Sequence, residues 1–367
     1  MKGHCKHLLS LAAAAAALCV PTQAVAADWV VKGRGFGHGV GMSQYGAFGF
    51  AQEGMYYKQI LRHYYTGVAI DEAGTRSVRV LIASGLESMP LTGATDACGE
   101  SLEEDKTYSF RLDSGGISLH GSTGSKIAGC GQAGKAKGGE TVVFSGVAVY
   151  RGDLRARNVG GSLFAINKVG LEGYVKGVIP NESPSHWPQA ALQAQAVAAR
   201  SYALATRING DGYDLYDDTR SQVYGGVSSE TAETNEAAEA TAFQVITSAG
   251  EVAAAFFFST SGGQTENSEF GFSGGSPRSY LKSVDDPFDD LSPVHRWRLG
   301  FSQETMEAKL SGLFQGNLKK IRVLTTGVSP RIVEAKVIGS QGSSVVSGAS
   351  LSYRLGLRST WANFKKR

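Results

Sequence analysis

The amino-acid sequence predicts an α+β fold in which β-rich segments surround one central, Ala-rich helix. Residues 189–206 contain many Ala and neither Gly nor Pro, which is typical of a helix. In residues 77–168, short runs of alternating apolar and polar side chains are separated by Gly and Ser clusters, as expected for strands. The chain contains 48 Gly, which indicates many turns. With 367 residues, 42% of them hydrophobic, it can bury the core of one large domain or two.

Residues 1–27 have the pattern of a secretory signal peptide. Two Lys precede an apolar run at residues 8–20, and the small-x-small pattern Ala24-Val25-Ala26 marks a cleavage site. The apolar run is too short to span a membrane. We therefore expect an exported chain, secreted or periplasmic, with no stable membrane span after cleavage. The alternative is an uncleaved anchor helix.

Removal of the signal peptide leaves two cysteines, Cys98 and Cys130. In an exported protein these two residues are expected to form a disulfide, and two reduced thiols are the alternative. No Cys-x-x-Cys or His-Glu-x-x-His motif is present, so the sequence predicts neither a metal site nor a cofactor. A net charge of +3 gives no indication of nucleic-acid binding.

Residues 33–47, GRGFGHGVGMSQYGA, carry a Gly at every second position from 33 to 41. This spacing indicates a backbone that another segment approaches closely, or one forced into positive φ. As a nucleotide-binding signal it is weak, because no strand–helix unit with a distant acidic residue follows it. His38 and Gln44 are polar groups within this crowded segment, and a lone His is more often structural. From Tyr45 to Tyr65 the pattern predicts a small helical hairpin.

The segment from 171 to 207 contains a candidate acid, Glu182. A helical run ends at Pro180, and a second helix begins after Pro188, whose missing N–H is not needed at a first helical position. Glu182 then lies in a short Asn-Glu-Ser-Pro loop beside His186 and Trp187. An apolar, aromatic setting raises a carboxyl pKa, as an acid catalyst requires. Capping of the following helix is the alternative role for this side chain.

After the helix predicted at 189–206, the sequence pattern indicates a mixture of loops, short helices and strands. Asp214, Asp217 and Asp218 are candidate calcium ligands or catalytic carboxylates. The remaining expected elements are a surface helix at 229–242, a buried strand at 253–258, a polar loop at 259–267, a short helix at 304–313 and strands at 321–325 and 332–338. The run Gly134–Gly139 is expected to be a mobile loop.

The stretch LEGYVKGVIPNESPSHWPQAALQAQAVAARSYAL resembles the signature of the sporulation stage II protein D / LytB family of bacterial cell-wall proteins. Four other segments are similar to that family: YDLYDDTRSQVYGG at 213–226, FFSTSGGQTENSEFGF at 257–272, YLKSVDDP at 280–287 and GRGFGHGVGMSQYGA at 33–47. The resemblance therefore extends over most of the chain.

The resemblance implies a peptidoglycan lytic transglycosylase that cleaves between N-acetylmuramic acid and N-acetylglucosamine in glycan strands stripped of stem peptides. It implies a fold whose Gly-rich loops line a glycan groove, and a wall-associated location. The catalytic Glu of the family falls on Glu182. The residues expected to bind substrate are Arg200, Tyr202, Gln222, Tyr224, Ser261, Gly262, Gly263, Gln264, Glu266, His38 and Gln44. Arg200 is equally well interpreted as a structural ion-pair partner, and the loop around Ser261 as a plain turn.

Two other functional hypotheses belong to different classes. One is a non-catalytic wall-binding module that stimulates a partner, an N-acetylmuramoyl-L-alanine amidase. The other is a two-carboxylate hydrolase with Glu266, Asp217 or Asp285 as the second acid. Some relatives bind zinc through Cys, His and Cys, at positions where this chain has Tyr216, Arg220 and Ser221, so no zinc is predicted.

The order of the segments differs from that in relatives, where GHGVGMSQYGA usually closes the domain. Here it opens the mature chain, which resembles a circular permutation. Permutation requires neighbouring termini, so the strand around Trp29–Lys32 is expected to lie beside Ser359–Phe364. The expected parts are a signal peptide at 1–27, the permuted segment at 28–70, a β-rich subdomain at 71–168, a catalytic core at 169–299 and a C-terminal β-rich part at 300–367.

Overall fold

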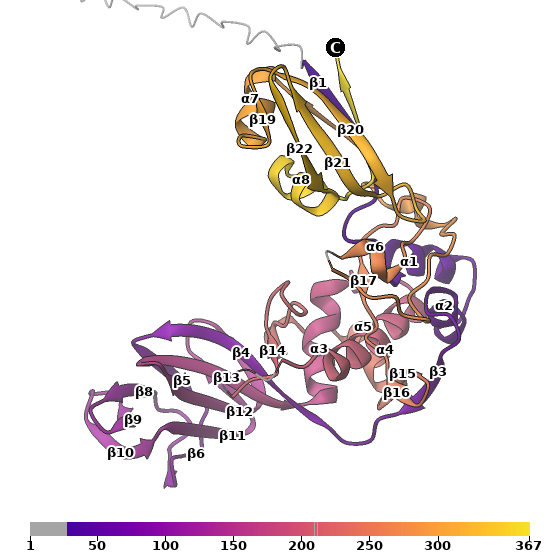
Figure 1. The fold of residues 1–367 in the computed structure, drawn as a ribbon. Helices are drawn as coiled ribbons and strands as arrows, with labels where there is room; N and C mark the ends of the chain where they lie inside the picture. The colour runs from indigo at the N-terminus through magenta and orange to yellow at the C-terminus, as the bar shows by residue number, and fades with distance from the viewer. Residues whose placement is uncertain (1–27, 209, 211, 273) are drawn as a thin grey trace, which may run out of the picture.

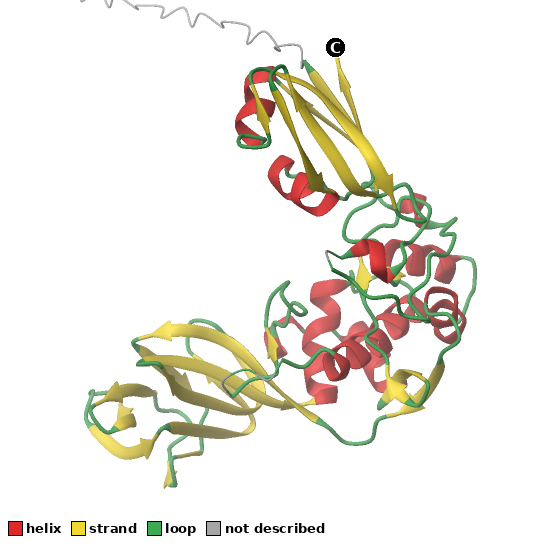
Figure 2. Ribbon diagram, in the orientation of Figure 1, coloured by secondary structure: helices red, strands yellow, loops and turns green. Residues whose placement is uncertain are grey.

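The computed structural model describes residues 28–208, 210, 212–272 and 274–367, so the predicted signal peptide lies outside the described residues. The chain forms an arc of three parts: a β-rich arm, a helical centre and a C-terminal sheet body (Figure 1). Most helices gather in the centre, whereas strands dominate both ends (Figure 2). This separation of helices from strands agrees with the predicted α+β class. Among the described helices, none combines the length and apolarity needed to cross a membrane.

The β-rich arm is a largely antiparallel sheet with the strand order β10-β9-β8-β5-β11-β12-β13-β4-β14. Its strands are β4 (Ser77–Leu86), β5 (Ser88–Thr92), β6 (Asp96–Ala97), β7 (Glu100–Ser101), β8 (Tyr108–Asp113), β9 (Gly116–Gly121), β10 (Lys126–Gly131), β11 (Ala133–Phe144), β12 (Ala148–Val159), β13 (Ser162–Gly170) and β14 (Leu215–Tyr216). A disulfide joins Cys98 to Cys130 in this arm. The short β14 pairs in parallel with β4 and so attaches the 213–226 segment to the arm.

The prediction of a mobile loop at Gly134–Gly139 is wrong. These residues belong to β11, which pairs with β12, and Ala136 is fully buried. A Cβ at Gly134 would lie 2.6 Å from the ring of Phe110, so here glycine makes room for a packed aromatic side chain. At Gly134, glycine therefore reflects close packing within a strand and not a flexible backbone.

The helical centre is built around α4, which packs against several neighbouring helices and against β15. Its elements are α1 (Gln44–Gln52), α2 (Tyr57–Tyr64), α3 (Leu171–Glu182), α4 (Gln189–Ala205), α5 (Ala232–Ala240), α6 (Ser268–Gly271), the 3₁₀ helices η1 (Gly226–Ser229) and η2 (Asp289–Leu291), and the strands β2 (Met42–Ser43), β3 (Ala69–Glu72), β15 (Gln244–Ser248), β16 (Glu251–Val252) and β17 (Phe257–Phe258). Most residues of α4 are buried, and its many Ala allow neighbours to approach from several sides. The predicted hairpin corresponds to α1 and α2. Of the strand expected at 253–258, only β17 forms.

Glu182 is the last residue of α3, not a residue of the turn that the sequence suggested. Pro180 lies inside this helix and does not end it. Beyond Pro180, the backbone N–H of Ser183 still donates to the carbonyl of Ile179 at 2.8 Å. Proline removes one donor but leaves the later ones in place, so the helix continues for its last residues.

The C-terminal body combines the two ends of the described chain. Its elements are β1 (Trp29–Arg34), β18 (Arg296–Phe301), α7 (Gln303–Lys309), β19 (Phe314–Gln315), β20 (Leu318–Thr326), β21 (Ile332–Gly339), β22 (Gly342–Ser347), α8 (Gly348–Leu355) and β23 (Ala362–Lys366). The prediction that the two ends lie side by side is confirmed, because β1 pairs with β23 (Figure 1). Val31 lies opposite Phe364, and Lys32 lies opposite Asn363. The 28–70 segment is thus divided, because β1 belongs to this body and α1 and α2 to the centre. The boundary expected at 299/300 falls within β18.

Candidate active site

A cleft of about 540 Å³ opens where four segments remote in sequence meet. They are the Gly-rich N-terminal segment, the ends of α3 and α4, the 219–221 turn and the region around β17. The lining residues are Phe36, Gly37, His38, Gln44, Glu182, Tyr202, Thr219, Arg220, Ser221, Phe256, Phe257, Phe258, Ser259 and Phe272. The predicted site residues among them are Glu182, Gln44, Tyr202 and His38.

The carboxyl group of Glu182 is held from both sides at the end of α3. Oε1 accepts a hydrogen bond from the backbone N–H of Val223 at 3.0 Å, and Oε2 accepts from Nε2 of Gln44 at 3.4 Å. Burial raises the pKa of Glu182 above its usual value, and these two hydrogen bonds oppose the shift only in part. The carboxyl-terminal end of a helix also disfavours a negative charge. The geometry favours a carboxyl group that keeps its proton at higher pH than an exposed glutamate does.

The apolar surroundings of Glu182 come from residues other than those expected. His186 is exposed, and Trp187 stacks on Phe48 with ring centroids 4.9 Å apart, so neither lines the cleft. The aromatic walls come instead from the run Phe256 to Phe258. The capping alternative fails, because Glu182 ends α3 and makes no side-chain cap at the start of α4.

Gln44 reaches Glu182 because the Gly-rich segment lies directly against β17. Its Nε2 also donates to the backbone carbonyl of Glu182 at 2.9 Å. Gly41 has φ 78°, and a Cβ there would lie 2.1 Å from the carbonyl oxygen of Phe256. Both explanations offered for the glycines, close approach and positive φ, therefore hold at this position. The close approach lets β2 pair with β17 and places Gln44 at the cleft.

His38 lines the cleft as a neutral ring. The N–H of Val40 donates to its Nδ1 at 3.0 Å, so the ring proton sits on Nε2, which donates to the carbonyl of Phe257 at 3.1 Å. Burial lowers the pKa of His38 to about 4, and the charge of Arg331 adds to this effect. With both nitrogens engaged by the backbone, the side chain is a structural wall of the cleft and is not free to move protons.

Tyr202 lies on α4 and faces the same cleft. Its ring meets Phe256 edge-on, with centroids 5.7 Å apart. Burial raises the pKa of the Tyr202 hydroxyl, and the charge of Glu182 contributes to the rise. The phenol is therefore a neutral hydrogen-bonding group close enough to Glu182 to be influenced by its charge.

The 219–221 turn was not foreseen as a lining segment. The guanidinium of Arg220 lies 3.8 Å from the ring centroid of Tyr216 and forms hydrogen bonds to both carboxylate oxygens of Asp218. The hydroxyl of Ser221 accepts from the N–H of Tyr216 at 3.1 Å. Stacking and hydrogen bonds thus hold the turn that carries Cys and His in some relatives. Among the residues that the structure describes, no group of three or more His, Cys, Asp or Glu is placed to hold a metal ion.

Arg200 does not reach the cleft, contrary to the substrate-binding prediction. Its guanidinium is fully buried, donates to both carboxylate oxygens of Glu172 at 2.9 Å, and also donates to the carbonyl of Ala238 at 2.7 Å. It joins α3, α4 and α5. The alternative interpretation, a structural ion-pair partner, is the one that the structure supports.

Gln222 and Tyr224 lie behind Glu182 and not in the cleft. Nε2 of Gln222 donates to the hydroxyl of Tyr174 at 3.2 Å, and the hydroxyl of Tyr224 donates to Oδ1 of Asn167 at 2.8 Å. Both side chains are almost fully buried. They support the backbone of Val223, whose N–H donates to Glu182. Gln222 and Tyr224 therefore support the site and do not line the cleft, contrary to the expectation that they bind substrate.

The 261–266 loop also lies away from the cleft. Ser261, Gly262, Gly263, Gln264 and Glu266 were expected to bind substrate, and none of them lines it. The hydroxyl of Ser261 and the N–H of Gly262 both donate to Oδ2 of Asp289, the N–H of Gly263 donates to Ser261, and the carbonyl of Gln264 accepts from Arg331. Glu266 is fully buried and accepts from the hydroxyl of Ser329 and the N–H of Val328. The loop therefore connects the helical centre to the C-terminal body.

The other carboxyl groups considered for catalysis do not line the cleft either. Burial raises the pKa of Asp217 to about 6, and Asp285 is exposed, but both lie outside the set of lining residues. Within the described part of the chain, Glu182 is the one carboxyl group that lines the cleft.

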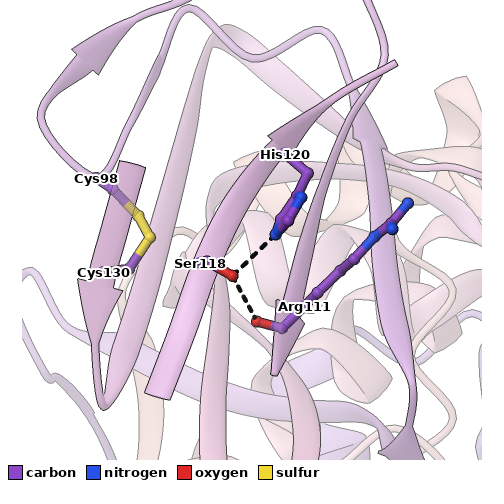
Figure 3. Close-up of a disulfide and its surroundings, with 5 residues drawn as sticks. All are labelled: Cys98, Arg111, Ser118, His120 and Cys130. Carbon is purple, nitrogen blue, oxygen red and sulfur yellow. Dashed lines mark hydrogen bonds between the residues drawn. A yellow bond between two sulfur atoms is a disulfide. The ribbon is translucent and has the colours of Figure 1, made fainter. Parts of the chain in front are cut away.

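A Ser–His pair in the β-rich arm is structural. The hydroxyl of Ser118 lies 2.9 Å from Nε2 of His120, close to the Cys98–Cys130 disulfide (Figure 3). Nδ1 of His120 faces the carbonyl of Gly124 at 2.9 Å, whereas a nucleophilic serine needs a base that an acid orients. Ser118 is fully buried, so no substrate can reach its hydroxyl.

Comparisons with known proteins agree with the motif resemblance. The family model described as Stage II sporulation protein matches residues 159–248. Stage II sporulation protein D of Bacillus subtilis is 30% identical over 251 residues, which are 63% of this chain and 68% of that protein. The amidase enhancer of Bacillus subtilis is 39% identical over 135 residues, 37% of this chain and 18% of that protein. An uncharacterized protein of Brachyspira hyodysenteriae is 34% identical over 123 residues, 33% of each chain. The chain belongs to the sporulation stage II protein D / LytB family.

Proposed function

We propose that this protein is a peptidoglycan lytic transglycosylase that cleaves the bond between N-acetylmuramic acid and N-acetylglucosamine in denuded glycan strands, with Glu182 as general acid and base. The observation that carries the proposal is the position of Glu182. It is a carboxyl group with a raised pKa, held by Gln44 and Val223, in a cleft with aromatic walls.

The reaction needs only one such group. The protonated carboxyl of Glu182 donates its proton to the bridging oxygen as the bond from that oxygen to C1 of the muramic residue breaks. The substrate's own acetamido group stabilises the positive charge that develops at C1. The C6 hydroxyl of the same sugar then bonds to C1 and gives its proton to the Glu182 carboxylate. The product is a 1,6-anhydro ring, and Glu182 is protonated again. Most glycoside hydrolases, in contrast, place a second carboxyl group across the bond.

The walls of the cleft suit a sugar chain. The half-buried rings of Phe256 and Phe257 and the exposed ring of Phe36 offer flat apolar surfaces on which sugar rings pack. Gln44 and Tyr202 add neutral hydrogen-bonding groups beside the acid. A half-buried, aromatic environment lets Glu182 deliver a proton at a pH where an exposed carboxyl group is ionised.

A second candidate function is stimulation of a cell-wall amidase without catalysis. It is favoured by the similarity to the amidase enhancer of Bacillus subtilis. Under this hypothesis the cleft binds a glycan strand and no bond is broken.

Product analysis separates the hypotheses. Denuded glycan is incubated with the wild-type protein, with Glu182→Gln, and with Asp217→Asn as a control for a second carboxyl group of raised pKa outside the cleft. Mass spectrometry is expected to find anhydro-muramyl ends with the wild type and with Asp217→Asn, and none with Glu182→Gln. Ordinary reducing ends would instead indicate a hydrolase, especially if Asp217→Asn abolished them. Absence of any product from denuded glycan, together with faster cleavage of intact peptidoglycan, which keeps its stem peptides, by an added amidase, would favour the second candidate.

A further inference from the structure

A second groove, of about 450 Å³, lies on the outer face of the sheet β18-β1-β23 and is lined mainly by cations. The lining residues are Lys32, Gly33, Arg34, Arg296, Trp297, Arg298 and Asn363. The four charged side chains are exposed, whereas Trp29 and Val31 on the other face are buried. We call the face that carries these four cations the basic face.

The cations of the basic face stand directly opposite one another. In the antiparallel register of β1 and β18, Lys32 pairs with Arg298 and Arg34 pairs with Arg296. Like charges in direct cross-strand register destabilise a sheet. Within the described residues, none of the four makes an ion pair. Folding alone therefore gives no reason for this arrangement, but an anionic ligand does.

Arg34 and Arg296 are partly positioned in advance. The guanidinium of Arg34 lies 5.1 Å from the ring centroid of Trp361, and a nitrogen of Arg296 donates to the carbonyl of Gly262 at 3.1 Å. Burial and the neighbouring charge of Arg34 lower the pKa of Arg296, which reports the mutual repulsion of the pair. The negative charges of Asp289 and Asp290 raise the pKa of Arg296 in the opposite direction, but neither carboxylate forms an ion pair with it. The planar fork of arginine matches a carboxylate in bidentate fashion.

The basic face begins at the edge of the cleft. Arg34 is two residues before Phe36, which lines the cleft, so their Cα atoms are at most about 7 Å apart. Arg358 is exposed, with its guanidinium 5.9 Å from the ring centroid of Phe36, and its carbonyl accepts from the N–H of Gly37. Along the strands, the two rows of opposed cations are separated by about 7 Å. Positive charge thus continues from the rim of the cleft along the sheet.

We propose that the basic face binds the muramic lactyl carboxylates of the glycan strand that leaves the cleft. This inference rests on the proposed function, because it takes the strand in the cleft as the occupant. Each muramic residue that has lost its stem peptide exposes one free carboxylate, so a denuded strand is a regular polyanion. An intact stem peptide converts that carboxylate to an amide and removes the charge at the lactyl position. The basic face therefore gives a physical reason for selecting denuded strands.

Binding of labelled glycan oligomers tests this inference without turnover. All proteins are full mature chains that carry Glu182→Gln, and affinity is measured by fluorescence anisotropy. The oligomers are denuded strands with either free carboxylates or carboxylates converted to neutral methylamides. The test variant adds Lys32→Gln and Arg298→Gln. The matched control adds Lys320→Gln and Arg322→Gln, an exposed Lys and Arg on β20 outside the groove.

The test variant is expected to bind the free-carboxylate oligomer about tenfold or more weakly than its parent, whereas the control stays within about twofold. The amidated oligomer should bind all proteins equally, and added salt should remove the preference for free carboxylates. The test variant should melt no lower than its parent, because it loses a repulsive pair. This check excludes unfolding as the cause of weaker binding.

Equal affinity for the two oligomers, or equal binding by the test and control variants, overturns the inference even if the native protein forms anhydro products. Preferential binding of a phosphodiester polymer over the carboxylated glycan also overturns it. Conversely, if the native protein forms no anhydro products but the carboxylate preference depends on Lys32 and Arg298, the inference stands and the proposed catalysis fails.

Discussion

Gln44 and Glu182 are 138 residues apart in sequence, and one side-chain amide joins them twice. Nε2 of Gln44 donates to the backbone carbonyl of Glu182 at 2.9 Å and lies 3.4 Å from its Oε2. The first contact satisfies a carbonyl that the end of α3 leaves without a helical partner. The second holds the carboxyl group in the cleft. The Gly-rich segment near the N-terminus is therefore part of the candidate site and not an accessory to it.

Replacement of Gln44 by Ala is expected to lower kcat by about tenfold or more, because the carboxyl group loses its orientation. The hydrogen bond from Gln44 favours the charged carboxylate and thus lowers the pKa of Glu182. Its loss raises that pKa further. A general acid must be protonated, so the high-pH limb of the activity profile should move to higher pH.

The pH profile of anhydro-product formation measures both effects of the Gln44 change. Gln52→Ala is the matched control, since Gln52 is the exposed last residue of the same helix. A limb that moves to lower pH, or a Gln52→Ala variant with the same loss, would show that Gln44 does not act through the Glu182 carboxyl group.

Glu182→Gln is expected to make the folded protein more stable at neutral pH. The pKa of Glu182 is raised in the folded state, so the folded protein binds this proton more tightly than the unfolded chain. The resulting penalty is absent below the unfolded pKa and grows as pH rises through the folded pKa. Glutamine has no such penalty, and its amide oxygen still accepts from Val223. Tm should rise by about 2 °C or more at pH 7 and hardly change at pH 4.

Calorimetry at pH 4 and pH 7 tests this expectation. Glu239→Gln is the control, because the pKa of Glu239 is shifted in the opposite direction. The ion pair with Lys176 lowers the pKa of Glu239, so its replacement should not stabilise the protein at pH 7. A Tm gain for Glu182→Gln that is as large at pH 4 as at pH 7 would contradict a raised pKa at Glu182.

The sequence predicted local features of this protein better than the contacts between distant segments. Glu182, Gln44 and Tyr202 were selected from motifs, and the pairing of β1 with β23 followed from the order of those motifs. The walls of the cleft were not foreseen, because Phe256 to Phe258 face it only once β17 lies beside β2. Local rules also failed at Pro180, where the helix continues, and at Gly134, where Phe110 occupies the space that glycine leaves.

The same limit explains the residues that were assigned to substrate and lie elsewhere. Arg200 and Glu266 belong to motif segments, but a motif does not reveal whether a side chain faces the cleft or supports it. Burial decides the matter here: both side chains are fully buried and hydrogen-bonded to other protein groups. Tertiary packing determines which groups these side chains contact, and those contacts cannot be deduced from one sequence alone.

Arg200 provides a test of the distinction between support and contact. Arg200→Met leaves the Glu172 carboxylate and the Ala238 carbonyl without their buried partner, and should lower the free energy of unfolding by about 3 kcal/mol or more. Arg200→Lys should recover only part of this loss, because an ammonium lacks the planar fork. Well below the unfolding transition, both variants should keep the wild-type KM for glycan, because Arg200 does not line the cleft.

Tyr202→Phe is the matched contrast on the same helix, since it removes one hydroxyl from a side chain that lines the cleft. It should change stability little and lower activity on denuded glycan by about tenfold. Chemical denaturation and steady-state kinetics on the three variants separate the two roles. If folded Arg200→Met showed a raised KM while Tyr202→Phe remained fully active, the assignment of Arg200 to support and Tyr202 to the cleft would be reversed. The reason for the expected result is geometric: the Arg200 guanidinium is enclosed by α3 and α5, whereas the Tyr202 ring meets Phe256 at the wall of the cleft.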